Sequence, residues 1–341
     1  RDFCLSRGLG DVYKRQSENC QELSELYSMP YISVVTPVYN AVNIVEELYR
    51  QIVENVSKIT NDFEIVMVND CCPYGSGEKI AQIARHDNRV KFIDFSRNFG
   101  QHIAISAGLD YAEGEYIVVM DCDLQDPPDK IPVLLEELKK SGKEIIFSVR
   151  EKRKESFLKL AYSYIFRSCM NLLADKVFRY DKDIGNFSII SRKVVMAIRQ
   201  FKEMNRNYAS LVFLSGFDCT FFTIESQKRF EGKSGYTFLK SLKHAFHILL
   251  QQSVKPLYIS VVFSIITFFC SCGFGVWILY NHFKGNYNVD GWASIMFAIT
   301  FCSSLIFFVL AVISLYIANI FTEGHSRPLY IIARTINTEE K

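Results

Sequence analysis

Short runs of apolar, β-branched residues recur along the first half of the chain and alternate with stretches in which apolar residues repeat every three to four positions. The runs predict buried strands and the stretches predict amphipathic helices. The predicted strands are Tyr31–Val35, Phe63–Val68, Val90–Phe95, Tyr116–Met120, Glu144–Val149 and about Asp218–Ile224, and the helices are about Val42–Val56, Glu78–His86, Gln101–Ala112 and Lys130–Lys140, with another from Lys193. This alternation predicts an α/β fold, doubly wound around a mostly parallel sheet.

Polar residues lie at or just after the ends of successive predicted strands: Thr36, Asp70, Arg97, Asp121 and Arg150. Because the carboxyl ends of parallel strands meet at one edge of a sheet, we expect these residues to gather there. Open α/β folds bind their ligands at this edge. The repetition therefore favours a ligand site over a series of solvated turns.

The stretch Ile117–Pro128, IVVMDCDLQDPP, is the most informative part of this pattern. A buried strand ends abruptly in Asp121 and Asp123, and both carboxylates can turn toward one cation if Cys122 lies at a bend. Mg²⁺ binds one or two carboxylates and completes its coordination with substrate phosphates. A solvated acidic turn is the alternative, since Asp-x-Asp alone is a common pattern.

Two long uncharged segments, Leu257–Tyr280 and Trp292–Ile320, follow the predicted α/β domain. A membrane span needs roughly 20 apolar residues, so each segment is long enough to cross once. The connecting loop carries only Lys284 and Asp290, whereas the outer flanks carry more cations: Lys240, Lys243, Lys255, Arg327 and Arg334. The positive-inside rule then places both flanks and the α/β domain in the cytoplasm. A buried hairpin in a soluble core is the alternative.

Composition narrows the class of protein. The 341 residues include 39 basic and 37 acidic residues, a net charge of +2, which gives no global basic surface for nucleic acid. The ten cysteines form no Cys-x-x-Cys pair and suit a reducing cytosol better than a disulfide framework. Residues 1–28 contain no apolar signal-peptide core and are expected to be a disordered or non-native leader.

Two further segments have open interpretations. Residues 151–180 are basic and aromatic, and the part from about Ser156 to Ala174 fits either a helix packed on the sheet or one lying at a membrane surface. Arg229–Tyr236, RFEGKSGY, is either a loop that closes over a diphosphate or a plain surface turn. The chain contains neither a G-x-x-x-x-G-K-[ST] phosphate loop nor a G-x-G-x-x-G after the first strand, which argues against a P-loop NTPase and a Rossmann dehydrogenase.

Five motifs together resemble those of a known family: Ser33–Asn40 (SVVTPVYN), Val68–Asp70 (VND), Ser96–Gly108 (SRNFGQHIAISAG), Met120–Pro128 (MDCDLQDPP) and Arg229–Tyr236. In this order, and followed by two apolar segments, they resemble glycosyltransferase family 2. The subgroup they resemble is the polyprenyl-phosphate glycosyltransferases, similar to dolichol-phosphate mannose synthase and the bacterial undecaprenyl-phosphate sugar transferases.

The resemblance implies a GT-A fold, a nucleotide-diphosphate sugar donor that is UDP-linked, and a Mg²⁺ or Mn²⁺ cofactor. It implies that Asp121, Asp123 and Gln125 hold the metal, the two aspartates being the catalytic residues. It also implies a donor site that is lined by Pro37, Tyr39, Val68, Asp70, Cys122, Arg150, Arg229 and Lys233.

Three positions depart from the subgroup's usual motifs. Ala41 stands where an acid usually follows the Asn, Asn186 replaces the Asp of a Gly-Asp-Phe motif, and Lys233 lies two places before its usual position in the last loop. These departures leave the donor sugar and the handling of the acceptor open.

The expected protein is a membrane-anchored inverting glycosyltransferase that transfers a sugar to polyprenyl (undecaprenyl) phosphate. Its expected location is the inner (plasma) membrane, as a multi-pass protein with a cytoplasmic catalytic domain; a homo-oligomer is an open alternative. The expected divisions are the leader, a GT-A domain at 29–235, a juxtamembrane helix at 236–256, two transmembrane helices at 257–320 and a cytoplasmic tail at 321–341. A non-lipid or polysaccharide acceptor and a catalytically inactive scaffold are the alternatives, although the Gln-x-x-Arg-Trp motif of processive synthases is absent.

Overall fold

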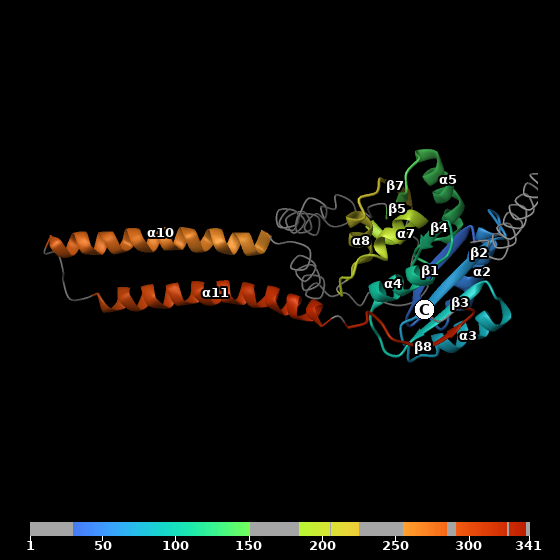
Figure 1. Cartoon of the computed structure of the whole chain (residues 1–341), viewed down its shortest axis with the longest axis horizontal. Coiled ribbons are helices and arrows are strands. Elements are labelled where there is room, and N and C mark those ends of the chain that lie inside the picture. Colours follow the sequence, from blue (N-terminus) through green and yellow to red (C-terminus); the bar gives the residue numbers. More distant parts are fainter. Residues whose placement is uncertain are drawn as a thin grey trace, which may run out of the picture.

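The computed structural model describes residues 30–150, 184–204, 206–224, 255–284, 291–325 and 327–338. Within them an eight-stranded sheet is flanked by helices, and two long helices extend away from it (Figure 1). The predicted leader, the segment Ser156–Ala174 and the loop Arg229–Tyr236 lie outside the described residues. The predicted juxtamembrane helix, 236–256, lies outside them as well, except for its last two residues, which begin a long helix at Lys255.

The strands are ordered β7-β5-β6-β4-β1-β2-β3-β8 across the sheet. They span Ile32–Val38 (β1), Phe63–Asn69 (β2), Val90–Phe95 (β3), Tyr116–Val119 (β4), Ile145–Arg150 (β5), Ile184–Ser191 (β6), Cys219–Ile224 (β7) and Ile332–Ile336 (β8). The pairs β1–β2, β1–β4, β2–β3 and β5–β7 are parallel, whereas β6 and β8 pair antiparallel with their neighbours. The prediction of a mostly parallel α/β sheet is therefore confirmed.

Helices cover both faces of the sheet, as expected of a doubly wound fold. They span Val45–Val56 (α2), Ser76–His86 (α3), Gln101–Tyr111 (α4), Ile131–Ser141 (α5, preceded by the short 3-10 turn η1 at Pro128–Lys130), Arg192–Ile198 (α7) and Tyr208–Leu214 (α8). One apolar core lies between the sheet and α2, α3 and α5, and a second lies between the sheet and α4, α7 and α8. The core residues of each face alternate along the strands, which is the period-2 pattern of a sheet packed on both sides.

Close packing of α4 fixes the position of that helix on the sheet. A Cβ atom added to Gly108 would lie 2.3 Å from Cγ1 of Val35 in β1, so only glycine allows this approach. The small residues Ala104, Ala107 and Gly108 predict close packing of this helix, and the contact of Gly108 confirms that prediction. The first residue of α4 is consequently held beside the carboxyl ends of the central strands.

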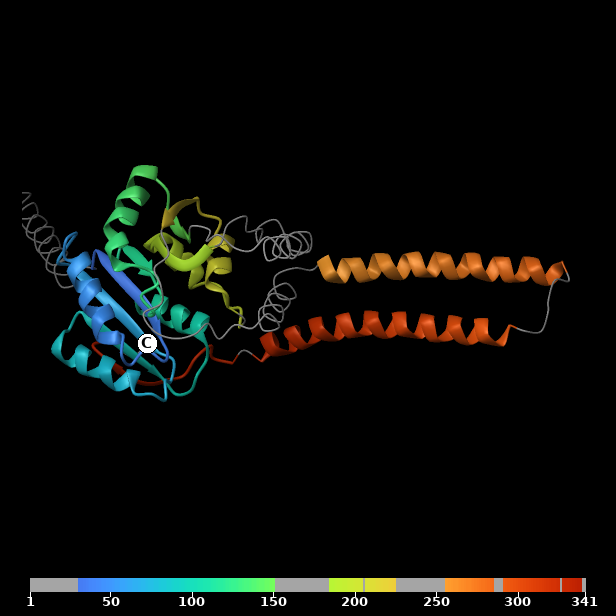
Figure 2. The ribbon, with the colours of Figure 1, turned by 180° about the vertical axis from the view of Figure 1, so that it is seen from behind.

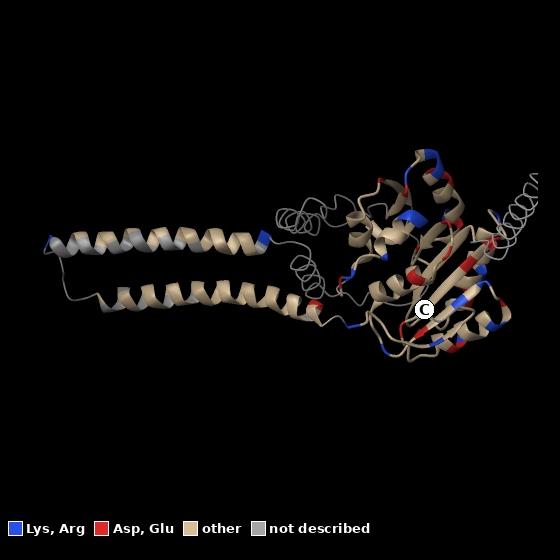
Figure 3. Ribbon diagram, viewed as in Figure 1, with Lys and Arg blue, Asp and Glu red and all other residues tan. Residues whose placement is uncertain are grey.

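The two long helices, α10 (Lys255–Phe283) and α11 (Trp292–Gly324), contact each other and run side by side in both views (Figures 1 and 2). In α11 the 18-residue window Phe301–Ala318 has a mean hydropathy of 2.5 and is not buried. Figure 3 shows no charged residue along α11 until its last turn, where Glu323 lies. Among the described residues this is the one helix that passes a length and hydropathy test for a membrane span, so the two-helix transmembrane hairpin stays a prediction.

The predicted cytoplasmic tail, 321–341, contains the last turn of α11 and a strand of the sheet that the sequence pattern did not predict. β8 pairs antiparallel with β3, and Arg334 in β8 bonds to Asp94 in β3 at 2.8 Å. The backbone amide of Met204 bonds to both carboxylate oxygens of Glu323 at 3.0 and 2.9 Å. The chain that leaves α11 therefore completes one edge of the eight-stranded sheet.

Candidate active site

Two aspartates lie at the carboxyl edge of the sheet, on either side of the central strand β1. The backbone amide of Met120 bonds to the carbonyl of Val35 in β1, and Asp121 follows directly. On the other side, the backbone amide of Asp70 bonds to the carbonyl of Val38, the last residue of β1. The predicted convergence of Asp70 and Asp121 on one edge is thus what the sheet register produces.

Asp70 is almost fully buried and is held by the turn that precedes α4. The backbone amides of Phe99 and Gly100 donate to its two carboxylate oxygens at 2.6 and 2.9 Å, and the side-chain amide of Asn98 donates to its carbonyl. Burial raises the pKa of the Asp70 carboxyl above its ordinary value, while the two backbone amides oppose that rise. The turn before α4 therefore holds the Asp70 carboxylate in one orientation at this edge.

The acidic loop after β4 contains a backbone conformation that is unfavourable for its residue. Leu124 has a φ of 57°, in the left-handed region, and its side chain is buried in the core beneath α2 and α5. A non-glycine residue in this region costs about 1–2 kcal/mol. The burial of Leu124 holds the turn, so that Asp123 and Gln125 on either side of it are only partly buried.

Hydrogen bonds organise the rest of this loop. Oδ1 of Asp123 accepts from the backbone amide of Gln125 at 3.1 Å, and Oδ2 of the buried Asp126 accepts from the backbone amide of Asp121 at 3.4 Å. Asp126 therefore supports the turn, whereas the predicted ligands Asp121, Asp123 and Gln125 keep partial exposure.

Asp121 also contacts two amide side chains, of which the sequence had singled out only Asn186. Its Oδ1 atom accepts from Nε2 of Gln101, the first residue of α4, at 2.6 Å and from Nδ2 of Asn186 in β6 at 3.1 Å. The predicted departure at Asn186 thus has a structural consequence, because an ionised aspartate there could not donate this hydrogen bond.

The donor set at this edge suits a hard divalent cation. Among the described residues no three Asp, Glu, His or Cys side chains form a metal-binding group. A site built from Asp121 and Asp123, with the amide oxygen of Gln125, matches the way Mg²⁺ uses one or two carboxylates and takes its other ligands from water and phosphate. The residues present fit the predicted cation on the basis of their chemistry.

The remaining predicted donor-site residues differ in how far they are buried. Tyr39 is 48% exposed and follows β1 at the same edge, and Cys122 is partly buried between Asp121 and Asp123. Burial raises the pKa of the Cys122 thiol to about 12, and the two neighbouring carboxylates add to the rise, so this thiol stays neutral. Pro37 is buried within β1.

Val68 is another residue that the resemblance places at the donor site. Its side chain is fully buried in the core beneath α4, 3.4 Å from the Cβ position of Gly108, and so it does not line an open pocket. Helices cover both faces of the sheet, so the side chains of β2 are buried whichever face they point to. Arg150 ends β5, which runs parallel to β4 through the antiparallel β6, so its backbone lies at the expected edge. Arg229 and Lys233 lie outside the described residues.

Ala41, which stands where the subgroup usually has an acidic residue, is buried just before α2. Its backbone amide donates to Oγ of Ser76 at 3.2 Å, and its carbonyl accepts from the amides of Ile44 and Val45. A longer acidic side chain is not needed for this turn.

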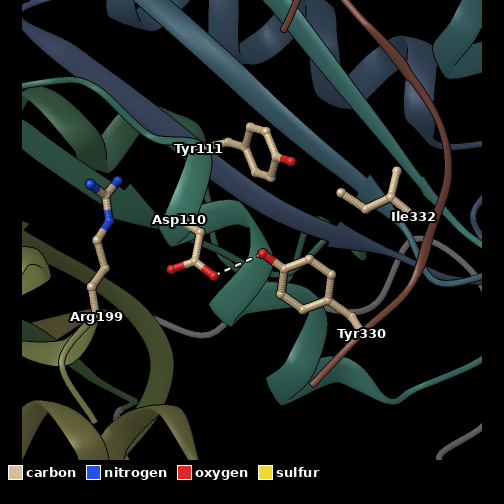
Figure 4. Close-up of a pocket in the computed structure, with 5 residues that line it drawn as sticks. All are labelled: Asp110, Tyr111, Arg199, Tyr330 and Ile332. Atoms are coloured by element: carbon tan, nitrogen blue, oxygen red, sulfur yellow. Dashed lines mark hydrogen bonds between the residues drawn. The ribbon is translucent and has the colours of Figure 1, made fainter. Parts of the chain in front are cut away.

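A separate cavity of about 470 Å³ lies away from these acids, between α4, α7 and the segment before β8 (Figure 4). It is lined by Asp110, Tyr111, Arg199, Tyr330 and Ile332. Tyr330 donates to Asp110 at 2.8 Å, and Arg199 donates to the carbonyls of Leu109 and Ala112 at the end of α4. These polar groups bond to the protein itself, which identifies the cavity as a seam where the C-terminal segment packs on the domain.

A doubly wound sheet with acidic side chains at its carboxyl edge defines the class of α/β proteins that bind ligands at that edge. The sequence profile of glycosyl transferase family 2 matches residues 33–213, and the chain belongs to that family. It is a glycosyltransferase with the GT-A fold.

Several known proteins are similar to this chain. The chain is 34% identical over 314 residues to the uncharacterized glycosyltransferase YkcC of Bacillus subtilis, covering 91% of this chain and 95% of the relative. It is 27% identical over 305 residues to the bactoprenol glucosyl transferase of Shigella phage SfII, covering 89% and 98%. The mannosyltransferase PcManGT from Pyrobaculum calidifontis, solved with GDP-Man and Mn²⁺, aligns with a TM-score of 0.45 at 17% identity, covering 68% of this chain and 64% of that chain.

Proposed function

We propose that the protein is a membrane-anchored inverting glycosyltransferase that transfers a sugar from a nucleotide-diphosphate sugar, UDP-linked, to polyprenyl phosphate at the cytoplasmic face of the inner membrane. The observation that carries the proposal is the pair of acidic groups at the sheet edge: Asp70 beside β1 on one side, and Asp121 with Asp123 on the other. Asp70, in its backbone cradle, binds the nucleoside, and the acidic loop lies where the diphosphate is held.

The chemistry at this edge requires stabilisation of a leaving group. An oxygen of the acceptor phosphate forms a bond to the anomeric carbon while the bond from that carbon to the diphosphate breaks, so negative charge collects on the nucleoside diphosphate. Mg²⁺ or Mn²⁺ held by Asp121, Asp123 and Gln125 would supply positive charge to that diphosphate. The phosphate monoester is already anionic near neutral pH, so the reaction needs little help from a general base.

The two long helices support a lipid acceptor. Apolar side chains of both are exposed, among them Phe269 at 66% in α10 and Phe307 at 70% in α11. Exposed apolar surface of this extent marks an interaction with a membrane or partner. The bactoprenol glucosyl transferases align over 89% of this chain, which extends the similarity beyond the catalytic domain. An anchored enzyme meets a membrane-borne phosphate in a restricted geometry.

The test uses purified full-length protein in vesicles with Mg²⁺ or Mn²⁺, undecaprenyl phosphate and a panel of radiolabelled nucleotide sugars, followed by organic extraction. We expect label from one donor to enter the organic phase. Donor hydrolysis without extractable label would overturn the lipid acceptor and favour a non-lipid or polysaccharide acceptor. If the protein bound no nucleotide, the proposal that it is an active glycosyltransferase would be wrong, and an inactive scaffold would be favoured.

A further inference from the structure

Asp121 is fixed by two neutral side chains that come from different elements. Gln101 begins α4 and Asn186 lies in β6, and both direct an amide N–H at the same carboxylate oxygen, Oδ1, at 2.6 and 3.1 Å. Two donors on one oxygen limit the rotation of the carboxylate about its χ2 angle. The direction in which Asp121 presents its negative charge is therefore set by groups outside the acidic loop.

The neutrality of these two donors matters for a cation site. A lysine or arginine in the same place would orient Asp121 equally well, but its charge would compete with a divalent cation for the carboxylate. An amide orients the carboxylate and leaves its full charge in place. Partners that hold a ligating carboxylate change metal affinity by about 10- to 100-fold when they are removed.

The position of Gln101 is itself tightly determined. Gly100, with a φ of 98°, ends the turn that bonds to Asp70, and its carbonyl accepts the amides of Ile103 and Ala104 at the start of α4. The close packing of Gly108 on Val35 fixes the helix farther along. Gln101 thus projects from a rigid support rather than from a loose loop.

We propose that Gln101 and Asn186 are positioning residues that orient Asp121 for the divalent cation and thereby set the metal affinity of the donor site. This inference rests on the metal site of the proposed function. It explains why the chain carries Asn186 where an aspartate would repel Asp121: the amide supplies the second hydrogen bond.

The experiment compares Gln101→Met, Asn186→Ala and the double variant with wild-type full-length protein. Gln101→Met is the main variant because Gln101 is exposed, so the substitution removes the donor without opening a cavity in the core. Gln51→Met is the matched control, since Gln51 bonds to Glu47 within α2, away from the strand ends. Mn²⁺ binding is titrated by electron paramagnetic resonance with UDP present, and UDP binding is titrated separately without metal.

We expect each single variant to raise the apparent Kd for Mn²⁺ about tenfold and the double variant to raise it further. UDP binding without metal and the thermal unfolding midpoint should stay unchanged, as should all properties of Gln51→Met. In turnover, the Mn²⁺ concentration for half-maximal rate should rise more than kcat falls. A merely structural role would not produce this separation.

An unchanged Mn²⁺ affinity in a folded Gln101→Met variant would overturn the proposal. Equal losses of Mn²⁺ binding and of metal-free UDP binding would also overturn it, since they would indicate a general disturbance of the edge. Wild-type protein that binds no Mn²⁺ would overturn both this inference and the metal site. The wild-type protein could also bind Mn²⁺ in the presence of UDP and yet transfer no sugar to lipid. That result would overturn only the proposed lipid acceptor, and the binding data would still support the role of Gln101.

Discussion

Gly108 in α4 lies so close to Val35 in β1 that an added Cβ atom would stand 2.3 Å from the valine Cγ1 atom. The contact matters for the active site because α4 begins with the turn that holds Asp70 and with the side chain that contacts Asp121. The packing of one glycine in the core is therefore linked to the geometry of both acidic groups.

Gly108→Ala should destabilise the protein by about 1–3 kcal/mol, because the added methyl group overpacks the core and displaces α4. Nucleotide binding should weaken with it, since Phe99 and Gly100 move with the helix. Thermal unfolding measures the first effect and UDP titration the second. In a Val35→Ala background, which makes room for the methyl group, the cost of Gly108→Ala should shrink; an equal cost in both backgrounds would show that this contact is not the cause.

Asp70→Asn should lower UDP affinity at least tenfold while the protein stays folded. The carboxylate accepts from two backbone amides, whereas asparagine offers one oxygen and places an NH₂ group against the other amide. Burial of the Asp70 charge is unfavourable, as its raised pKa shows, so the neutral asparagine regains part of the free energy that is lost with the hydrogen bonds. Asp62→Asn, on the exposed loop before β2, is the charge-matched control. Unchanged UDP binding in Asp70→Asn would remove Asp70 from the donor site.

Asp87 should give the catalytic domain an acid-sensitive part of its stability. Its carboxylate accepts from Arg89 and from the hydroxyl of Tyr49, and the hydrogen bonds of Arg89, with those of Tyr49, lower the pKa of Asp87 to about 2. A depressed carboxyl pKa stabilises the fold above the unfolded value near 4 and loses that effect as the pH falls toward about 2.

Asp87→Asn should therefore be less stable than wild type by about 1–2 kcal/mol at pH 7, after allowance for solvent screening, and the difference should narrow between pH 4 and pH 2. Thermal unfolding of the full chain in detergent across this pH range measures the difference. A difference that stays constant with pH would show that Asp87 stabilises the fold through hydrogen bonds that do not depend on its charge.

The sequence pattern predicted the strands that carry the site, because a β-branched apolar run that ends in an acidic residue can be recognised from the sequence alone. It predicted β3 with both ends correct and placed Asp70 and Asp121 at the same edge. The close packing at Gly108 could also be predicted from the sequence, since small residues on one face of a helix allow that helix to approach a sheet closely.

Other parts of the site leave little trace in a single sequence. Phe99 and Gly100 act through backbone amides, which every non-proline residue has, so no side-chain signal marks them. The contacts of Gln101 and Asn186 with Asp121 join residues 20 and 65 positions apart along the chain, and only the fold brings them together. Val68 was expected at the pocket because its motif is there, but helices cover both faces of β2, so its side chain lies in the core. β8 is a short run after a long apolar helix, and only its pairing with β3 identifies it as a strand.

In the proposed function, the acidic loop after β4 holds the cation that the enzyme needs to transfer a sugar to a lipid phosphate. The most direct measurement follows the transfer of label from the identified nucleotide sugar to undecaprenyl phosphate by wild-type protein and by Asp123→Ala in the same vesicles, with metal-free UDP binding as the control. The account predicts organic-phase label with wild type, a loss of at least a hundredfold in kcat/KM with Asp123→Ala, and unchanged UDP binding in the absence of metal. Substantial lipid-linked label from Asp123→Ala, with the metal dependence of wild type, would contradict it.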